Sequence, residues 1–419
     1  MKAAVIVIGD ELLIGQVTDT NSGMIARALA PLGWSVCQVM TVADDAAAID
    51  DAISRSFAVA PVVLTTGGLG PTKDDITKGV LCRRFGGELR RDEEVLDNVR
   101  RVFAAKHLAM NELTAAQADV PTSCRVIPNR VGTAPVMWFE ACGGRKVLVA
   151  MPGVPSETSV VFPEEVLPRL ARHFRTDSAV EHRTLITYGT TESGLAIHLD
   201  SFEKELPSGV HLAYLPKDGI IRLRLDSIAS EKAVAQDNIE RAEARLRELT
   251  APWLVADHDT TPAEMLLEKA RESGVTIATA ESCTGGNIAH RITLTAGCSD
   301  VMLGGVVAYC NDVKEKLLGV SHATLEAHGA VSEQTVREMA EGTCRATGAR
   351  LGIATSGIAG PGGGSEAKPV GTVCIGASLD GLTVSHTYHF GGSRRQIIER
   401  STTAAIMMAV RLLIDSKKR

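Results

Sequence analysis

Residues 275–290 read VTIATAESCTGGNIAH, an order of residue types that predicts a buried strand, a glycine-rich turn and the start of a helix. Such a turn leaves unpaired backbone N–H groups at the helix start, and Gly285 and Gly286 let a ligand approach them closely. Ser282 and Cys283 lie in the same turn. A nucleophile beside backbone N–H groups is what acyl transfer requires, although a glycine-rich turn with a capping Ser or Thr has the same sequence.

The region around this stretch, from about residue 258 onward, alternates apolar runs with amphipathic ones. We expect strands at residues 275–279, 301–309, 351–355, 372–378 and 383–390, and helices at residues 263–273, 287–294, 313–318, 333–347 and 394–414. Thr261, Pro262 and Glu264 carry the signals of a helix start, with Thr261 as the cap. This alternation is typical of an α/β sheet with helices on both faces.

Residues 1–172 show the same alternation. We expect strands at residues 3–8, 35–42, 61–66 and 146–150, and helices at residues 22–30, 46–57, 76–85 and 93–105. The pattern predicts a parallel sheet covered on both faces, whose functional loops lie at the carboxyl ends of the strands.

Residues 178–252 differ from both flanking regions. They predict a strand at 182–188, a helix at 193–206, a hairpin of 210–215 and 220–225, and a charged helix at 232–249. This order indicates a small α+β domain. We therefore expect an α/β protein with two three-layer α/β/α domains, residues 1–172 and 258–419, joined by a small α+β domain at residues 178–252.

The composition of the 419 residues is typical of a soluble globular protein, with 45% hydrophobic and 22% charged residues. A formal net charge of -6 without a long basic block argues against a nucleic acid or a membrane as the main partner. The nine cysteines show neither paired spacing nor a zinc pattern, which favours free thiols in a reducing compartment. No apolar run approaches the about 20 residues of a membrane span, and we expect a cytoplasmic protein.

Polar loops follow the expected strands of the first domain, at residues 9–22, 65–77, 129–135 and 151–157. The most informative one reads TTGGLGPTKDDIT, residues 65–77, and its glycines between a strand and a helix suit a phosphate or another anion. Asp74 and Asp75 would repel a bare phosphate, and a divalent cation shared by carboxylates and phosphate oxygens would remove that repulsion. The alternative is that Thr72 or Asp74 only caps the following helix.

The sequences GDELL at residues 9–13, TTGGLGPT at residues 65–72 and MPGVP at residues 151–155 resemble the amino-terminal half of the CinA family (competence/damage-inducible protein A). That half is similar to molybdopterin-binding domains, and in some members it hydrolyses the pyrophosphate of ADP-ribose with a divalent metal. The resemblance implies metal ligands among Asp10, Glu11 and Asp75, for Mg²⁺, Mn²⁺ or Co²⁺. The nucleotide-binding positions that it implies are Gly9, Gly67, Gly68, Gly70, Thr72, Pro152 and Gly153.

Three further segments place polar residues at strand ends in the last domain. Tyr309 ends one strand, and Lys314 lies about one helical turn into the next element. A second strand runs into the glycine-rich loop TSGIAGPGGGS, residues 355–365, and a third ends at FGGSRR, residues 390–395. In a parallel sheet these ends can converge on one crevice.

Together with Ser282, these segments resemble the nicotinamide mononucleotide deamidase domain that forms the carboxyl-terminal half of CinA proteins. The match extends from Ala280 to about Arg400. The resemblance implies no cofactor for this domain. It implies the catalytic residues Ser282, Lys314 and Tyr309, and the substrate-binding residues Thr284, Gly285, Gly286, Asn311, Ser356, Gly360, Gly362 and Arg394.

The middle segment then corresponds to the family's KH-type domain. It lacks a GxxG loop between two helices, so we predict no RNA binding from it.

The residues suggest a mechanism for the last domain. We hypothesise that Ser282 attacks the carboxamide carbon, while Lys314, if burial keeps it neutral, takes the serine proton and passes it to the departing ammonia. Tyr309 would relay the proton or orient the lysine, and N–H groups around Gly285 and Gly286 would hold the oxyanion. Arg394 and the loop at residues 360–364 are candidates for the 5′-phosphate.

Each of these side chains also has a purely structural interpretation. Lys314 could lie on a solvated helix face, Tyr309 in the core, and Arg394 could cap the preceding loop. Ser356 could simply end a strand. Cys283 is the rival nucleophile because a thiolate is intrinsically more reactive, but its nearest histidine in sequence lies about two helical turns away. The pattern of nucleophile and base therefore favours the serine.

The two halves together predict a bifunctional hydrolase that recycles fragments of pyridine nucleotides. Its expected partners are small nucleotides, namely nicotinamide mononucleotide and ADP-ribose, and we expect a homodimer. Two alternatives remain: the first domain could bind a pterin or nucleotide without turnover, or the protein could be a scaffold in DNA uptake or repair.

Overall fold

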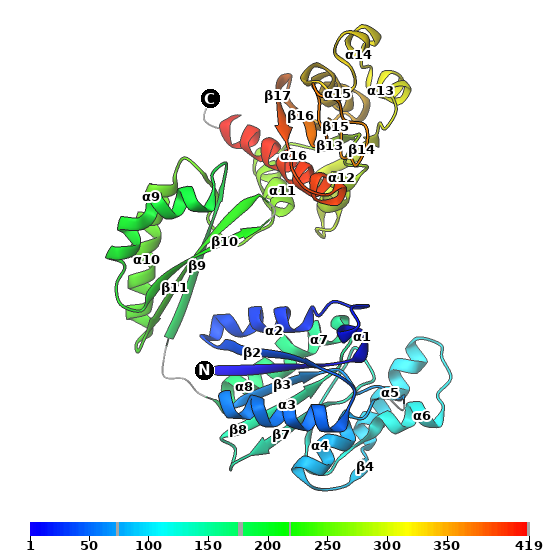
Figure 1. Cartoon of the computed structure of the whole chain (residues 1–419), viewed down its shortest axis with the longest axis vertical. Helices are drawn as coiled ribbons and strands as arrows, with labels where there is room; N and C mark the ends of the chain where they lie inside the picture. Colours follow the sequence, from blue (N-terminus) through cyan, green and yellow to red (C-terminus); the bar gives the residue numbers. More distant parts are fainter. Residues whose placement is uncertain (73–74, 175–178, 218, 417–419) are drawn as a thin grey trace. The chain divides into compact units, whose positions relative to one another are not determined.

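The computed structural model describes residues 1–72, 75–174, 179–217 and 219–416. The chain divides into two compact units, residues 1–181 with 228–236, and residues 182–227 with 237–419. A six-stranded, a four-stranded and a five-stranded sheet follow one another along the chain (Figure 1). The predicted fold class, an α/β protein with a small middle domain, is confirmed.

The first unit is built on a six-stranded sheet in the order β2-β1-β3-β8-β7-β6. One face packs against α2 (Asn21–Leu29), α7 (Pro155–Val161) and α8 (Leu167–His173), and the other against α3 (Ala46–Val59) and α4 (Thr77–Phe85). Neighbouring residues of β1, such as Val5 and Ile6, therefore enter different cores. The strands are β1 (Lys2–Ile8), β2 (Ser35–Val42), β3 (Val62–Thr66), β6 (Arg125–Ile127), β7 (Val136–Ala141) and β8 (Lys146–Met151).

Further elements complete this unit. They are α1 (Asp10–Leu13), α5 (Glu93–Ala105), α6 (Glu112–Ala115) and a ribbon of β4 (Leu89–Arg91) with β5 (Asp119–Pro121). The observed bounds of β2 and α5 are those expected from the sequence.

The four strands expected in the first unit, β1, β2, β3 and β8, pair in parallel as predicted, but the sheet contains two further strands that make it mixed. β7 pairs antiparallel with both β8 and β6. The cause is the tight turn between β7 and β8, where Cys142, Gly143 and Gly144 have φ of 52, 65 and 81°, because two strands joined by so short a turn run in opposite directions. β6 again runs with β8, so the loop after β6 still reaches the edge where β1, β3 and β8 end.

The middle domain has a four-stranded sheet in the order β10-β11-β9-β12. Its apolar face packs against α9 (Glu192–Glu205) and α10 (Lys232–Thr250). The strands are β9 (Ala179–Tyr188), β10 (Val210–Lys217), β11 (Ile220–Ala229) and β12 (Leu254–Ala256), and the predicted hairpin is the antiparallel pair β10–β11.

The five-stranded sheet of the last domain has the order β14-β13-β15-β16-β17. One face packs against α11 (Pro262–Ser273), α12 (Asn287–Thr293) and α16 (Arg394–Ser416). The other is covered by α13 (Asn311–Leu318), α14 (His322–His328) and α15 (Glu333–Thr347). The strands are β13 (Ile277–Glu281), β14 (Met302–Val307), β15 (Leu351–Gly357), β16 (Thr372–Leu379) and β17 (Leu382–His389).

This sheet is also mixed, because β16 pairs antiparallel with β15 and with β17. The two reversals cancel, so β17 runs in the direction of β13, β14 and β15. The carboxyl ends of these four strands therefore share one edge, where the sequence places its polar loops. α11 begins as predicted, with reciprocal hydrogen bonds between Thr261 and Glu264.

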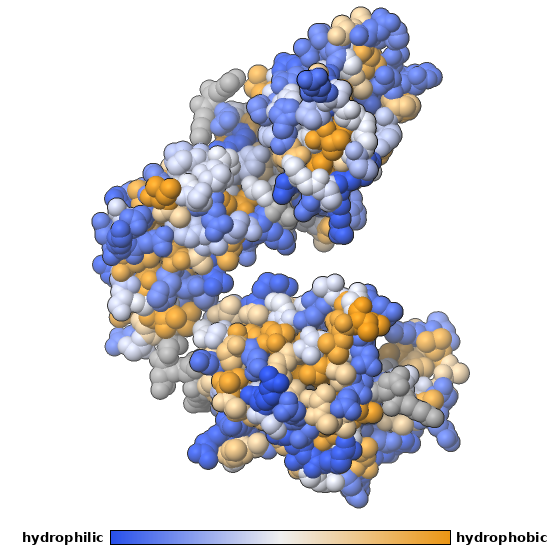
Figure 2. Space-filling view, in the orientation of Figure 1, coloured by the Kyte–Doolittle hydropathy of each residue, from blue (hydrophilic) through white to orange (hydrophobic). Residues whose placement is uncertain are grey.

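In the part of the chain that the structure describes, no helix has the length and apolar character that crossing a membrane requires. The face shown in Figure 2 is largely hydrophilic, with apolar side chains in separate patches.

Candidate active sites

The turn after β13 holds Ser282 at the carboxyl edge of the last sheet. The residue is 8% exposed, and its main-chain N–H donates to the carbonyl of Thr355 on the neighbouring strand at 3.0 Å. Gly285 and Gly286 follow with φ of 62 and 97°, values that side chains disfavour, before α12 begins. The predicted strand, turn and helix are thus all present, and the glycines make the sharp reversal possible.

Lys314 of α13 is the buried partner of this serine. Its side chain is 1% exposed, and its Nζ lies 3.3 Å from Ser282 Oγ. The same Nζ lies 2.8 Å from the carbonyl oxygen of Ala308 and 3.4 Å from that of Tyr309. Burial lowers the pKa of Lys314 below its usual value, because a charged ammonium loses its hydration there.

The three contacts of Lys314 suit a neutral amine. A neutral amine has two N–H groups and one lone pair. The carbonyls of Ala308 and Tyr309 can accept these two N–H groups, and Ser282 Oγ lies at the third position, where it accepts from an ammonium and faces the lone pair of a neutral amine. The hydroxyl can then donate to the amine, which is the arrangement needed for proton transfer from serine to lysine.

Cys283, the rival nucleophile, lies in the apolar core beneath the turn. It is 6% exposed, and burial raises the pKa of its thiol to about 12. A thiol with so high a pKa is protonated at neutral pH and is a poor nucleophile. The geometry therefore favours Ser282.

The oxyanion site predicted at Gly285 and Gly286 is wrong. The Gly285 N–H donates to the Ser282 carbonyl at 3.1 Å, and the Gly286 N–H donates to the Glu281 carboxylate at 3.0 Å. Among the described contacts, no other residue accepts from the N–H of Cys283 or Thr284. The donors left for an oxyanion are thus those of the two residues directly after the nucleophile.

Arg394, at the start of α16, ties together two of the loops at this edge. It donates from Nη1 to the Gly360 carbonyl at 2.7 Å and from Nη2 to the Tyr309 hydroxyl at 3.1 Å. The predicted convergence of these loops is therefore present. The Tyr309 side chain is 62% exposed, and among the described contacts it is the carbonyl of Tyr309, not its hydroxyl, that meets Lys314.

The remaining predicted substrate-binding side chains divide into two groups. Thr284 is buried, with Oγ1 2.8 Å from Glu281 Oε2 and 2.7 Å from Thr355 Oγ1, and Ser356 donates to the Ala330 carbonyl at 2.7 Å. The hydroxyls of Thr284 and Ser356 are therefore engaged in hydrogen bonds within the protein. Asn311, like Gly362, is exposed at the same edge.

The polar loops of the first unit surround a second cavity, of about 670 Å³, at the carboxyl edge of its sheet. Its lining contains every N-terminal position named from the sequence: Gly9, Asp10, Glu11, Gly67, Gly68, Gly70, Thr72, Asp75, Pro152 and Gly153. A Cβ on Gly67 would lie 2.0 Å from the Ile8 carbonyl oxygen, so this loop requires glycine where it passes β1.

Asn21 joins two of these loops and was not singled out from the sequence. Its Nδ2 donates to Thr66 Oγ1 and to the Gly153 carbonyl, each at 2.8 Å. Thr66 in turn donates to the Pro152 carbonyl at 2.7 Å. An Asn at the start of a helix resembles an ordinary cap, which is why the sequence alone gave no signal.

Three of the carboxylates at this cavity, Asp10, Asp44 and Asp75, accept hydrogen bonds from main-chain N–H groups. Asp75 accepts from the N–H groups of Gly70 and Thr72 at 2.7 and 2.9 Å, so it shapes its own loop. The main-chain N–H groups of Asp10 and Asp44 each donate to the other residue's carboxylate, at 3.2 and 3.3 Å. Burial, together with the charges of Asp10, Glu11 and Asp75, raises the pKa of Asp44.

These carboxylates do not form a complete metal site on their own. Within residues 1–72, 75–174, 179–217 and 219–416, no group of three or more His, Cys, Asp and Glu side chains is placed to hold a metal ion. Asp74, the other acid of the loop, lies outside the described residues. Asp19, Asp44 and Glu157, which are not among the metal ligands expected from the sequence, also line the cavity.

Comparison with known protein families gives three matches along the chain, in the same order as the three sheets. Residues 4–172 match the probable molybdopterin binding domain, residues 182–255 the damage-inducible protein CinA KH domain, and residues 259–413 the CinA C-terminal domain. A CinA-like protein of Salinibacter ruber is 39% identical over 413 residues, which cover 99% of this chain and 100% of the relative. The chain belongs to the CinA family.

A second full-length relative agrees with this assignment. A CinA-like protein of Chloroherpeton thalassium is 40% identical over 420 residues, covering 99% of each chain. A solved structure, the competence/damage inducible protein CihA from Agrobacterium tumefaciens, is 40% identical and covers 36% of this chain and 93% of its own, with a TM-score of 0.35. These CinA names state neither a substrate nor a reaction.

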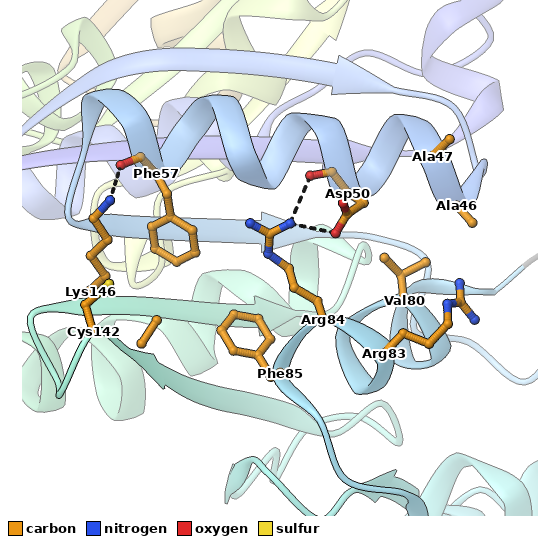
Figure 3. Close-up of a pocket in the computed structure, with 11 residues that line it drawn as sticks. Ala46, Ala47, Asp50, Phe57, Val80, Arg83, Arg84, Phe85, Cys142 and Lys146 are labelled. Atoms are coloured by element: carbon orange, nitrogen blue, oxygen red, sulfur yellow. Dashed lines mark hydrogen bonds and ion pairs between the residues drawn. The ribbon is translucent and has the colours of Figure 1, made fainter.

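The first unit of this CinA-family chain has a larger hollow, of about 830 Å³, between α3, α4 and the turn after β7 (Figure 3). Its polar side chains are largely engaged within the protein: Arg84 pairs with Asp50 at 2.6 Å, and Lys146 donates to the Phe57 carbonyl at 2.7 Å. The charged groups of Asp50, Arg84 and Lys146 in this hollow are therefore engaged within the protein.

Proposed function

We propose that the last domain hydrolyses the carboxamide of nicotinamide mononucleotide to nicotinate mononucleotide and ammonia. The observation that carries this proposal is the contact of 3.3 Å between Ser282 Oγ and Nζ of Lys314, a lysine that is 1% exposed. A buried lysine with a lowered pKa is a suitable general base for a serine. The substrate comes from the family resemblance, and the geometry agrees with amide hydrolysis.

In the proposed reaction, Ser282 Oγ bonds to the carboxamide carbon while its proton passes to the neutral amine of Lys314. The N–H groups of Cys283 and Thr284 would stabilise the resulting oxyanion. The carbon–nitrogen bond then breaks, and Lys314 returns its proton to the departing ammonia. Water attacks the acyl-enzyme ester, and Lys314 takes one of its protons and passes it to Ser282 Oγ as the ester bond breaks. The nicotinic acid that forms loses the other proton to solvent and leaves as nicotinate.

Arg394 is placed to recognise the phosphate of the same substrate. Its guanidinium uses two of its donors on the Gly360 carbonyl and the Tyr309 hydroxyl. A guanidinium carries five N–H donors, so it can bind a phosphate and keep the loops together. The exposed residues of the 360–364 loop lie next to this charge.

The first experiment measures ammonia release from nicotinamide mononucleotide by the full chain and by Ser282→Ala, Cys283→Ala and Lys314→Ala. We expect release by the wild type and Cys283→Ala, and loss in the other two. Activity should rise with pH as Lys314 loses its proton, because only the neutral amine accepts a proton. A folded wild type that releases no ammonia would contradict the deamidase assignment.

For the first domain, the proposal is hydrolysis of the pyrophosphate bond of ADP-ribose with a divalent cation. A cavity of about 670 Å³ with glycine loops and six carboxylates, among them Asp10, Asp44 and Asp75, supports this choice. Because the described carboxylates do not form a three-ligand set, any cation would need oxygens of the substrate to complete its shell, and no mechanistic step is assigned to it.

The test is release of AMP from ADP-ribose with Mg²⁺, Mn²⁺ or Co²⁺ and with a chelator. Release that stops with the chelator supports the pyrophosphatase. Tight binding of ADP-ribose without products would instead support the non-catalytic binding module.

A further inference from the structure

Glu281, the last residue of β13, is a buried carboxylate that the proposed reaction does not use. It is 1% exposed and lies one residue before the nucleophile. Its Oε2 accepts from the N–H groups of Gly286 and Ile288 at 3.0 and 2.9 Å, and its Oε1 accepts from the N–H of Ala289 at 2.9 Å. An acid at this depth is costly unless donors compensate it, and here main-chain N–H groups do so.

These contacts replace the usual cap of a helix. α12 has Gly286 in the cap position, with φ of 97°, and a glycine has no side chain that could accept from the first N–H groups. Glu281 reaches back across the turn and supplies the missing acceptor. The Thr284 hydroxyl, 2.8 Å from Glu281 Oε2, attaches the middle of the turn to the same carboxylate.

The nucleophile is therefore held from both sides. On one side, the Ser282 N–H donates to the Thr355 carbonyl. On the other, Glu281 fixes residues 284–289 and uses the N–H groups of Gly286, Ile288 and Ala289, while those of Cys283 and Thr284 stay free of it.

We propose that Glu281 is a positioning residue for Ser282, whose carboxylate fixes the turn so that the serine hydroxyl stays in contact with Lys314 and the N–H groups of Cys283 and Thr284 remain available for the oxyanion. The inference rests on the proposed function for the reaction that is assayed. Glu281 acts through the turn, and none of its described contacts reaches Lys314 or Ser282 Oγ.

Glu281→Gln tests this role with almost no change in shape. A carboxylate accepts at both oxygens, whereas an amide presents an NH₂ group to Ala289 or to Gly286 and Ile288, whichever way it is turned. We expect kcat to fall about 100-fold, the size of effect that follows a misplacement of about 1 Å, with KM within about threefold of the wild type. Because Glu281 does not exchange the reacting proton, the pH at which activity is half-maximal should stay unchanged.

Glu281→Asp tests partial recovery of activity, and Thr343→Val is a control for loss of stability. The aspartate keeps the charge at a shorter reach, so we expect it to recover part of the kcat lost in the glutamine variant. Thr343 is also buried and donates to β13 at the Thr279 carbonyl, at 3.2 Å. Its valine variant should lose stability with little change in kcat. Equal losses of kcat in Glu281→Gln and Thr343→Val, at equal loss of melting temperature, would overturn the inference.

A readout that does not depend on the substrate separates this inference from the proposed function. Labelling of Ser282 by a fluorophosphonate, followed by intact mass, reports the reactivity of the hydroxyl alone. If the wild type is labelled and Glu281→Gln is labelled at least about tenfold more slowly, the result supports positioning even if nicotinamide mononucleotide is not hydrolysed. Equal labelling rates, or no labelling of the wild type, overturn the positioning role.

Discussion

The two candidate sites occupy the same place in their sheets but differ in the solvent exposure of their ionisable side chains. Both lie where parallel strands end, after β1 and β3 in the first unit and after β13 in the second. In the second, Ser282 and Lys314 are 8% and 1% exposed. In the first, Asp10 and Glu11 are exposed to solvent. The same edge thus carries a desolvated pair in one domain and hydrated carboxylates in the other.

The difference in exposure determines which chemistry each site can support. Burial lowers the pKa of Lys314 because it destabilises the ammonium form, so a larger share of the amine is neutral and can accept a proton. Exposed carboxylates keep their charge and can attract a cation that arrives with a phosphate.

The largest effect is expected from Lys314→Met. The change removes the amine and keeps most of the side-chain volume, so kcat for ammonia release should fall about 1,000-fold. Lys316→Met is the matched control, because that lysine lies on the same helix with a side chain 75% exposed. Its kcat should stay within about twofold of the wild type. Equal losses in both variants would mean that helix α13, and not the buried amine, matters for activity.

The next effect concerns Asp44 in the first unit. Asp44→Asn removes one negative charge from the carboxylates, while the amide oxygen can still accept from the Asp10 N–H. We expect AMP release from ADP-ribose to fall about 10- to 100-fold, as when a partner of a metal site is lost, with ammonia release unchanged. Asp51→Asn, at an exposed surface pair with Arg55, is the control. Unchanged AMP release in Asp44→Asn would exclude a role for this acid.

Most of this architecture could be predicted from the sequence, because the spacing of apolar residues shows which positions of a helix or strand are buried. β2, α5 and α15 have the bounds that we expected. The reversed direction of β16 was not predicted, since a buried strand has the same composition whichever way it runs. The strands β6 and β7 were missed altogether.

At the site, the sequence identified Ser282 and Lys314 as a pair but not the role of Glu281. A glutamate directly after an apolar run resembles the solvated end of a strand, and only the fold shows that its carboxylate turns inward to the N–H groups of α12. The oxyanion donors were misassigned to the glycines for the same reason, because hydrogen bonds within a turn cannot be read from residue types.

A smaller effect is expected at Arg394. Arg394→Gln should raise KM for nicotinamide mononucleotide about tenfold, because a charged hydrogen bond to phosphate is lost, and should change kcat little. Nicotinamide riboside, which lacks the phosphate, gives the control within the same enzyme. Its kcat/KM should be similar in both proteins. A loss that is as large for the riboside would assign Arg394 to holding the Gly360 and Tyr309 loops instead.

The smallest effect is on stability and follows from the lowered pKa of Lys314. Its pKa in the unfolded chain is about 10.4. Between the folded and the unfolded pKa, the unfolded state binds one more proton, so the free energy of unfolding rises with pH by up to about 1.4 kcal/mol per unit. Lys314→Met lacks this contribution. The melting temperature of the wild type should therefore increase relative to the variant between pH 7 and pH 10, by about 2–4 °C for each kcal/mol. A difference that stays constant over this range would mean that Lys314 keeps its proton in the folded protein, and the contrast between a desolvated base and hydrated acids would lose its strongest support.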